Sequence, residues 1–504
     1  MVLKRNVMNV VAALFEAQYV LTYIGLWYFA FNLIAMVAGF VPWPLVLVLI
    51  SVVYRYFWCE RISTQQRDTR NKNCFAVIIG GGFSGICAAV RLKMSGIPFT
   101  VLEKSTDVGG TWFNGVYPGS GCDTMSHMYQ YSFHPNPLWS RFLVGWDEIN
   151  RYLNNTCDHF KVRQYFKFNT IAQRCEFDRT TNKWRVYLSD TVTHESDTIE
   201  CDFVISAVGA IHIPKIPNIK GIEIFEGEMF HTSKWKKDFE MHGKRIALIG
   251  TGCSGIQVMP HLAKQSQELF VFQRSATYAL PTFNFKFPHF ILNLFSLFPF
   301  AMEIQRWYSF VRLEMIYYLA LRRNSATNKL LQFIAKLLIQ AQIADPALKR
   351  KLTPNYTMGS KRIAISTDYI QSFNRRNVAL INQPIEQITK DSIITTDGNE
   401  TKIDAIILAT GFDTLKSITG GIRVERPSDN KTLSEVWGMN PESYLGTMHP
   451  GFPNLFTLLG PGTELGEIYW INTIMLLSNF LLVLKLNTKT VTEYICMYSI
   501  TRLQ

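Results

Sequence analysis

The stretch from Phe75 to Gly85, FAVIIGGGFSG, decides the fold of this chain. A short apolar run rich in β-branched residues leads into a cluster of glycines, and a helix-like segment follows. This order is typical of a strand, a tight turn and a helix whose N-terminus faces a pyrophosphate. Glycine allows the backbone to approach the phosphates closely. We therefore expect a dinucleotide-binding turn, formed by Gly80, Gly82, Ser84 and Gly85.

The same pattern returns about 170 residues later, from Ile246 to Gly255, as IALIGTGCSG. One such turn is weak evidence, but two in the same strand-turn-helix context indicate a protein that holds two dinucleotides. The sequence therefore predicts an α/β fold with two Rossmann-type dinucleotide-binding domains. The second turn is expected to use Gly250, Thr251, Gly252, Ser254 and Gly255.

The residues that end the next strand differ in charge between the two turns. Glu103 lies 21 residues past Gly82, where a carboxylate can bind ribose hydroxyls and would repel a 2′-phosphate. Arg274 occupies the equivalent place after the second turn, where a guanidinium suits a 2′-phosphate. We expect FAD at the first turn and NADPH at the second. The alternative is that Arg274 is an ordinary solvated residue.

Composition narrows the remaining classes of function. The chain has 504 residues, 48% of them hydrophobic and 18% charged, with a net charge of +12. Residues 283–362 hold twelve Lys or Arg and three acidic residues. No nucleic-acid-binding module accompanies this basic bias, so anionic lipid or phosphate-bearing cofactors explain it better. The nine cysteines include no CxxC pair, which argues against a zinc site or a redox-active disulfide, and no metal is expected.

A hydrophobic region covers residues 8–58. Its longest uncharged run, Tyr19 to Phe40, has 22 residues and could span a bilayer. Basic residues follow, which predicts a membrane-anchored protein with a cytoplasmic catalytic domain, at the endoplasmic reticulum in a eukaryotic cell. One spanning helix and a hairpin both fit the sequence. Residues 8–58 are thus expected to contact membrane lipid.

The pattern suggests four segments along the chain. Residues 1–60 form the anchor, residues 75–240 the first part of the FAD-binding domain, residues 241–400 the NADP-binding domain with a helical insertion at 283–343, and residues 401–504 a return to the FAD-binding domain. The apolar stretch from Tyr469 to Leu484 fits a packed final helix better than a second membrane contact, because Asn472 and Asn479 interrupt it.

Several further motifs resemble those of a known family. Gly109-Gly110-Thr111-Trp112 with Tyr117-Pro118-Gly119 and Asp123 resembles a signature of Baeyer–Villiger monooxygenases. The spacing of Phe225, Gly227, His231 and Trp235 resembles their linker fingerprint, a variant of which occurs in flavin-containing monooxygenases. The segments from Phe272 to Ala276 and from Gly359 to Ile363 resemble two more. The similarity covers about residues 75–465 and identifies a class B flavoprotein monooxygenase.

This resemblance implies an FAD- and NADPH-dependent enzyme that inserts one atom of O2 into a small lipophilic substrate through a C4a-peroxyflavin. It implies that Arg362 stabilises negative charge on the substrate oxygen and that Asp123 orients Arg362 near the flavin. Lys361 and Arg274 match contacts to the NADP 2′-phosphate, and His231 matches a structural linker residue. Further cofactor contacts are implied at Gly110, Thr111, Trp112, Asp123, Tyr129 and Ser275.

Two departures from the family pattern keep other activities open. Gly121 stands where many relatives carry arginine, and Lys236 stands where the Baeyer–Villiger fingerprint prefers proline or aspartate. The first choice is Baeyer–Villiger oxidation of a ketone or aldehyde. The alternatives are oxygenation of a soft nitrogen or sulfur, and a flavin-binding membrane protein that no longer oxygenates. The second alternative rests on the tail after Gly460-Pro461-Gly462, which resembles the family less than the rest does.

Overall fold

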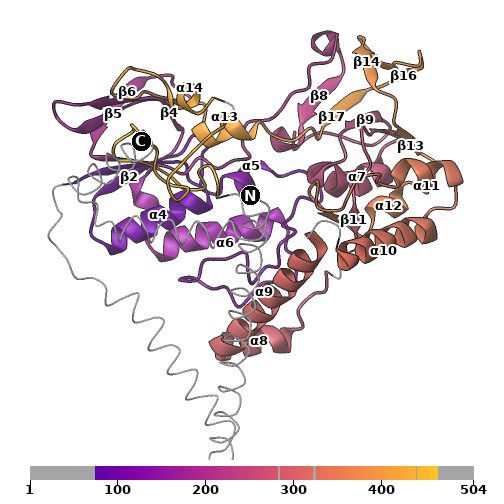
Figure 1. Cartoon of the computed structure of the whole chain (residues 1–504), viewed down its shortest axis with the longest axis horizontal. Coiled ribbons are helices and arrows are strands. Elements are labelled where there is room, and N and C mark those ends of the chain that lie inside the picture. The colour runs from indigo at the N-terminus through magenta and orange to yellow at the C-terminus, as the bar shows by residue number, and fades with distance from the viewer. Residues whose placement is uncertain (1–73, 282–283, 322–324, 439, 464–504) are drawn as a thin grey trace, which may run out of the picture.

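The computed structural model describes residues 74–281, 284–321, 325–438 and 440–463, with side chains omitted at 311–321. Figure 1 shows two lobes, each built around a sheet, with a group of helices below and between them. The expected anchor at residues 1–60 and the stretch from Tyr469 to Leu484 lie outside the described residues. Within the described ranges, no helix is both long enough and apolar enough to cross a bilayer.

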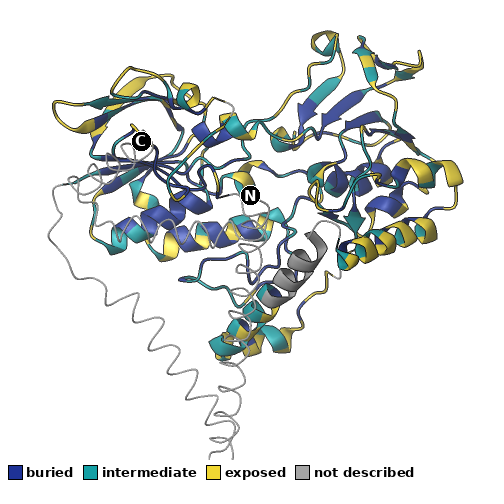
Figure 2. Cartoon of the chain, viewed as in Figure 1, coloured by how far each residue is buried: buried dark blue, intermediate teal, exposed yellow. Residues whose placement is uncertain are grey.

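The first lobe contains a five-stranded parallel sheet in the order β19-β7-β1-β2-β3. Every residue of β1 and β7 is buried, which explains why both strands read as continuous apolar runs. Helices α4 and α6 cover one face (Figures 1 and 2). The elements are β1 (Ala76–Ile79), α4 (Phe83–Met94), β2 (Phe99–Leu102), α5 (Thr111–Asn114), α6 (Trp146–His159), η3 (Arg163–Tyr165), β3 (Phe166–Lys167), β7 (Phe203–Ser206) and β19 (Leu455–Thr457).

The second lobe repeats this design with the order β13-β10-β9-β17-β8, again parallel. Helices α7 and α12 pack on one face, and a small antiparallel sheet, β14-β15-β16, packs on the other. The elements are η4 (Ile222–Ile224), β8 (Glu228–His231), η5 (Thr232–Lys234), β9 (Arg245–Ile249), α7 (Cys253–Gln265), β10 (Glu268–Phe272), α12 (Tyr369–Ser372), β13 (Val378–Ile381), β14 (Ile385–Ile388), β15 (Ser392–Thr395), β16 (Glu400–Lys402) and β17 (Ala405–Leu408).

The chain crosses between the sheets at points other than the expected boundaries of 240 and 401. Strand β8 precedes residue 240 and β17 follows residue 401, yet both belong to the second sheet. The reason is that β17 pairs with β9 in parallel, with Ala405 opposite Ile246. A buried apolar strand shows its burial in the sequence but not its partner, so the sequence placed β17 with the wrong sheet.

A second sheet covers the other face of the first lobe, in the order β18-β4-β5-β6. Trp184 of β5 is fully buried against this face and donates a hydrogen bond from Nε1 to the carbonyl of Pro453 (2.9 Å). The elements are β4 (Thr170–Asp178), β5 (Lys183–Asp190), β6 (Ser196–Cys201), α13 (Thr414–Thr419), β18 (Arg423–Val424) and α14 (Leu433–Trp437).

The insertion expected at residues 283–343 is helical, as the sequence predicts. It contains α8 (His289–Leu297), α9 (Pro299–Leu321) and α10 (Ala326–Gln342), and α11 (Pro346–Leu352) follows. Phe295 of α8 and Met302 of α9, with Phe287 just before α8, form a core cluster with Met125 and Phe142 of the first lobe. Helix α10 packs against the second lobe. The insertion therefore touches both lobes, and a two-stranded sheet of β11 (Ala279–Leu280) and β12 (Ala364–Ile365) closes it.

Candidate active site

The first glycine turn joins β1 to α4, as expected. A Cβ on Gly85 would lie 1.8 Å from the carbonyl oxygen of Gly80, so only glycine lets the helix pack this close to the turn. No side chain caps α4, and its first turn contains no acidic residue. The backbone N–H groups around Ser84 are therefore left for an anion.

Glu103 lies directly beside this turn and is buried. Its Oε2 accepts the N–H of Gly81 (2.5 Å), and its Oε1 accepts the N–H of Ser105 (2.8 Å). Each carboxylate oxygen can accept more than one hydrogen bond, so the side chain is held in place and keeps capacity for ribose hydroxyls.

The signature that begins at Gly109 supplies the opposite wall of the turn. Gly110 has φ +56°, a conformation that favours glycine. It also lies close to the turn, because a Cβ on it would be 3.0 Å from the Cα of Gly82. Thr111 then begins α5 and is exposed, whereas Trp112 donates from Nε1 to the hydroxyl of Tyr129 (3.1 Å). Burial raises the pKa of Tyr129, so its hydroxyl stays protonated at neutral pH.

The second turn joins β9 to α7. Its middle glycine, Gly252, has open space around it, whereas the equivalent Gly82 of the first turn contacts Gly110. Nothing lies within 4 Å of a Cβ built on Gly252, whereas a Cβ on Gly255 would lie 2.3 Å from the carbonyl oxygen of Gly250. Helix α7 also has no side-chain cap. Thr251 is buried, and its carbonyl accepts the hydroxyl of Thr277 (2.8 Å). The exposed Gly252 leaves room for a phosphate above the helix N-terminus.

The residues expected at the 2′-phosphate come from two distant segments. Ser275, just after β10, accepts a hydrogen bond from Lys361 Nζ (2.7 Å), and this ammonium also lies 4.8 Å from the ring centroid of Tyr356. Arg274 is exposed and adjacent to Ser275. The structure therefore brings the three residues to one place on the second lobe.

Asp123 and Arg362 form an ion pair although they lie 239 positions apart in the chain. The guanidinium Nη2 of Arg362 donates to Asp123 Oδ2 (2.7 Å). The side chain of Asp123 is 14% exposed and that of Arg362 is 46% exposed. Burial alone would lower the pKa of Arg362, but the charge of Asp123 and its hydrogen bond, together with the nearby thiols of Cys253 and Cys122, raise the pKa overall. Arg362 is thus a permanently charged group that Asp123 holds in place.

A polar clamp between the lobes is a feature that sequence reasoning missed. Gln257 of α7 accepts the hydroxyl of Tyr117 at Oε1 (2.6 Å) and donates from Nε2 to the carbonyl of Gly121 (2.9 Å). Gly119 lies against the same helix, where a Cβ would meet the carbonyl oxygen of Gln257 at 2.4 Å. The loop that leads to Asp123 is therefore fastened to the second lobe. A glutamine two residues after a glycine turn gave no signal of this role.

The linker residues His231 and Lys236 have partners other than Asp123 and Arg362. His231 ends β8, and its Nδ1 accepts the N–H of Ser233 (3.1 Å) at the start of η5. Burial lowers the pKa of His231, so the ring is neutral at pH 7. Lys236 forms a partly exposed ion pair with Glu228 (3.2 Å). This departure from the family pattern therefore lies on the surface of the second lobe.

The two turns satisfy what a dinucleotide requires. Each turn has a glycine where a Cβ would clash with the backbone, followed by a helix whose N-terminus has no side-chain cap. The residue beyond the next strand differs: the first turn has the fixed carboxylate of Glu103, and the second has the exposed Arg274. These residues fit FAD in the first lobe and NADP in the second. Fold and site together define a flavoprotein with two nucleotide pockets.

Comparison with known proteins identifies the family. Residues 73–299 match the model of flavin-binding monooxygenase-like proteins. The chain is 35% identical to a Baeyer–Villiger monooxygenase of Streptomyces coelicolor over 393 residues, which is 77% of this chain and 74% of that protein. It is also 35% identical to one of Pseudomonas aeruginosa over 407 residues, 81% of this chain and 76% of that one. The chain belongs to the Baeyer–Villiger monooxygenases, which are flavin- and NADPH-dependent enzymes.

Solved structures agree with this assignment. OTEMO in complex with FAD and NADP superposes with a TM-score of 0.74 at 29% identity, covering 82% of this chain and 86% of that chain. The closed form of cyclohexanone monooxygenase gives a TM-score of 0.71 at 27% identity, covering 82% and 84%. The α/β fold with FAD and NADP domains is therefore that of Baeyer–Villiger monooxygenases.

Proposed function

We propose that this enzyme inserts an oxygen atom beside the carbonyl of a lipophilic ketone or aldehyde, with Arg362 as its catalytic residue. The observation that carries the proposal is the ion pair between Arg362 and Asp123. Asp123 ends a loop fastened to α7, whose N-terminus forms the second glycine turn. A charged guanidinium is thus available close to the second nucleotide pocket.

The proposal assigns the cofactor contacts as follows. FAD would be held by the first turn, with Glu103 on its ribose and Trp112 and Tyr129 in the adjoining wall. NADPH would be held by the second turn, with its 2′-phosphate on Arg274, Ser275 and Lys361. FAD, once reduced by NADPH, supplies the activation of O2. Support comes from the charge difference between the two pockets and from the Lys361–Ser275 hydrogen bond.

Arg362 has two tasks in this proposal. Oxygen addition to a carbonyl builds negative charge on the substrate oxygen, and a fixed guanidinium stabilises that charge. Its positive charge also favours the ionised form of an oxidant beside it. Asp123 acts as a positioning residue, because its carboxylate holds Nη2 of Arg362 at 2.7 Å. Gln257 and Tyr117 fix the loop that carries Asp123.

The test is Arg362→Ala, with Arg350→Ala on the exposed side of α11 as the matched control. Loss of an oxyanion-stabilising donor costs roughly 2.7–4 kcal/mol, so ester formation from a ketone should fall about 100- to 1,000-fold. Stopped-flow absorbance should show that NADPH still bleaches the flavin in this variant. Unchanged ester formation would exclude Arg362 from the oxygen-transfer step.

Heteroatom oxygenation is the second candidate, suggested by the lysine at position 236. Lys236 argues against it, because this residue is half-exposed and pairs with Glu228 of β8 rather than with Asp123 or Arg362. Product analysis separates the candidates: an ester from a ketone probe, or a sulfoxide from a thioether with no ester. NADPH-dependent O2 consumption separates both from a flavin-binding protein without oxygenase activity.

We also propose that residues 8–58 anchor the enzyme to a membrane, with the catalytic lobes in the cytoplasm. The support is the 22-residue uncharged run from Tyr19 to Phe40 and the basic residues that follow it. Resistance to carbonate extraction, together with protease accessibility of the lobes in sealed vesicles, tests this orientation.

A further inference from the structure

Exposed apolar side chains are concentrated on the helical insertion. Among the described residues, sixteen large hydrophobic side chains are exposed, and ten of them lie between residues 285 and 337. The two lobes share the other six. The ten, which we call the apolar face, are Phe285, Phe290, Leu294, Leu297, Ile304, Tyr308, Leu330, Phe333, Ile334 and Leu337.

Helix α10 shows that this exposure follows a pattern. Its buried residues Asn328, Ala335 and Ile339 share one side, which packs on the protein. At about 100° per residue, Leu330, Phe333, Ile334 and Leu337 share the opposite side. A helix that packs on the protein with one side and exposes an apolar stripe on the other is suited to contact an apolar partner or the apolar part of a membrane.

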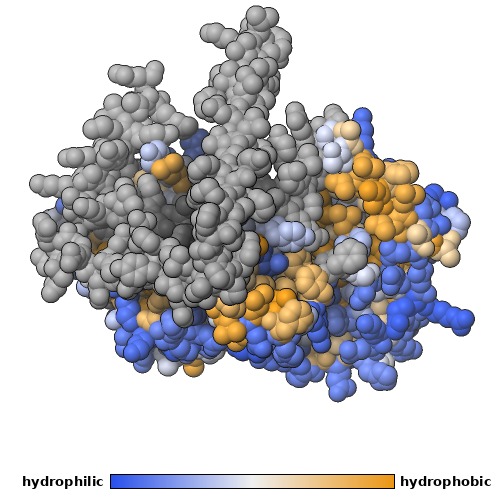
Figure 3. Space-filling model, turned by 90° about the horizontal axis from the view of Figure 1, so that it is seen from below, coloured by the Kyte–Doolittle hydropathy of each residue, from blue (hydrophilic) through white to orange (hydrophobic). Residues whose placement is uncertain are grey.

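Helices α8 and α9 extend the same surface. Phe290 and Leu297 of α8 are 68% and 72% exposed. Between the two helices lies a groove of about 370 Å³ whose lining residues are apolar except for Gln305. Figure 1 shows α8, α9 and α10 at the lower side of the molecule, and Figure 3, viewed from below, shows hydrophobic side chains gathered at two places there.

The exposed charges beside the α8 and α10 parts of the apolar face are positive, whereas α9 carries Glu303 and Arg306. Lys329 and Lys336 are exposed on one flank of the α10 stripe, and Lys286 is exposed just before α8. Neither α8 nor α10 contains an acidic residue. An apolar stripe bordered by lysines matches the boundary between acyl chains and anionic headgroups, where the lysine ammonium groups can reach the phosphates.

We propose that the apolar face of α8–α10 docks on a phospholipid bilayer that contains anionic lipid. A second copy of the chain is a poorer partner, because a two-fold contact would bring Lys329 and Lys336 against their own counterparts. The first 73 residues are poorer too, because they hold seven basic and three acidic residues and offer no charge complement. Docking would place the groove between α8 and α9 at the source of a lipophilic substrate.

The test uses the full-length holoenzyme with vesicles that carry a phospholipid with a photoactivatable acyl chain. One set contains phosphatidylcholine alone, and the other adds 30% phosphatidylserine. Peptide mapping after illumination should find label in residues 285–308 and 326–342, several-fold more with phosphatidylserine. Leu138, Val192 and Ile216, exposed apolar residues elsewhere, should remain unlabelled. This readout is independent of any anchoring by residues 8–58 and of turnover.

Two sets of variants sharpen the outcome. Leu330→Gln with Phe333→Gln should remove most label from 326–342, whereas the control Val192→Gln with Ile216→Gln should leave it unchanged. Lys329→Gln with Lys336→Gln should abolish the preference for phosphatidylserine. Label confined to residues 1–60 would overturn the proposal. The apolar face would then be covered by another part of the chain or, if the protein forms a concentration-dependent dimer, by a second copy. Equal labelling with both lipid mixtures would overturn the role of anionic lipid.

Discussion

At the scale of single residues, the site depends on pairs that the chain assembles from far apart. Arg362 finds Asp123 across 239 positions, and Lys361 finds Ser275 across 86. Lys361 and Arg362 are adjacent in sequence, yet Lys361 contacts Ser275 and Arg362 contacts Asp123. One backbone segment therefore sets the spacing between the expected 2′-phosphate contact and the expected catalytic guanidinium.

Lys361→Ala should weaken NADPH binding specifically. An exposed ammonium that contacts a phosphate contributes toward the low end of the 1.5–3 kcal/mol typical of charged hydrogen bonds, which corresponds to roughly a tenfold higher KM. The KM for NADH should not change, because NADH lacks the 2′-phosphate. Steady-state kinetics with both nucleotides measures this, with Lys349→Ala on α11 as control. Equal losses for both nucleotides would contradict the assignment.

Two glycines of the second turn should behave differently when replaced by alanine. Gly255→Ala forces a Cβ to 2.3 Å from a backbone oxygen and should lower the free energy of unfolding by about 1–3 kcal/mol. Gly252→Ala meets nothing within 4 Å, so its stability should not change, but NADPH affinity should fall. Urea denaturation and NADPH titration together distinguish the two effects. A destabilised Gly252→Ala variant would mean that this position has a packing role.

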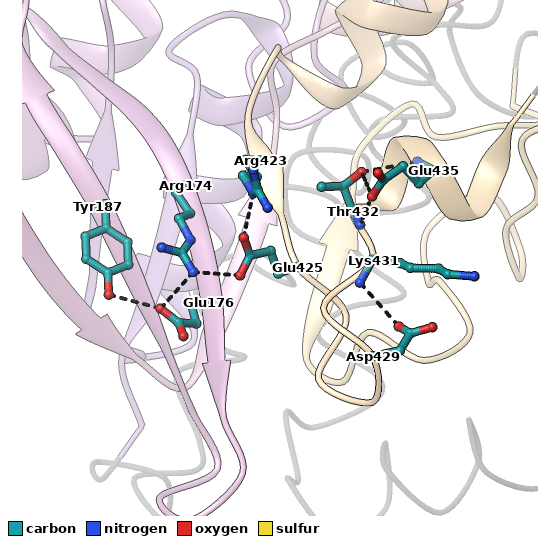
Figure 4. A network of polar contacts seen from close by, with 9 residues as sticks. All are labelled: Arg174, Glu176, Tyr187, Arg423, Glu425, Asp429, Lys431, Thr432 and Glu435. Atoms are coloured by element: carbon teal, nitrogen blue, oxygen red, sulfur yellow. Dashed lines mark hydrogen bonds and ion pairs between the residues drawn. The ribbon is translucent and has the colours of Figure 1, made fainter.

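At the scale of elements, a polar network links β18 and the residue that follows it to β4, its neighbour in the sheet that covers the first lobe (Figure 4). Glu425 accepts Arg174 Nη2 (2.7 Å) and Arg423 Nε (2.6 Å), and Arg174 also reaches Glu176 (3.4 Å). The Glu425 side chain is 8% exposed, so its charge depends on these two arginines. The network reinforces a two-residue strand whose backbone also pairs with β4, with Arg423 opposite Arg174 and Val424 opposite Cys175.

Hydrogen bonding from Arg174 lowers the pKa of Glu425. A carboxylate with a lowered folded pKa stabilises the protein above its ordinary value near 4.3, and the contribution is lost as the pH falls through the folded value. Glu425→Gln should therefore cost about 1.5 kcal/mol at pH 7, with both arginines partly exposed, and progressively less below pH 4. Chemical denaturation at pH 7, 4 and 3 tests this. The exposed control Glu195→Gln should show no such dependence.

The sequence predicted more of the two turns than of the sheets around them. Strand, glycine turn and helix are local, so FAVIIGGGFSG and IALIGTGCSG indicate their structures directly. The Asp123–Arg362 contact was expected only through the family resemblance, since nothing local in either segment points to the other. The partner of β17 and the clamp of Gln257 depend on contacts more than 100 positions away, and no residue pattern announces them.

At the scale of the whole molecule, the two lobes are interleaved along the chain. The first sheet draws on β1 near its start and on β19 at residues 455–457, and the second needs β8 before and β17 after its central segment. Neither sheet is therefore formed by one continuous segment of the chain. The hydrogen bond between Tyr117 and Gln257 provides a further contact between the two lobes.

A chain that stops after residue 400 should lose both nucleotide sites. It would lack β17, which lies between β9 and β8, and β19, which pairs with β7. We expect it to be insoluble and colourless, whereas a chain that stops after residue 463 keeps both sheets and should purify with bound FAD. Flavin absorbance of the two products is the measurement. A yellow, soluble 1–400 product would show that the first lobe folds without its last strand.

The late position of β19 also bears on synthesis. From the synthesis of β7 at residues 203–206 until that of β19 at residues 455–457, one edge of β7 lacks the strand that pairs with it, and exposed strand edges invite aggregation. Translation at about 5–20 residues per second leaves that edge uncovered for many seconds. The nascent enzyme should therefore depend on chaperones until β19 has been made, and a nonsense mutation anywhere before residue 455 should be as damaging as one near the start of the coding sequence.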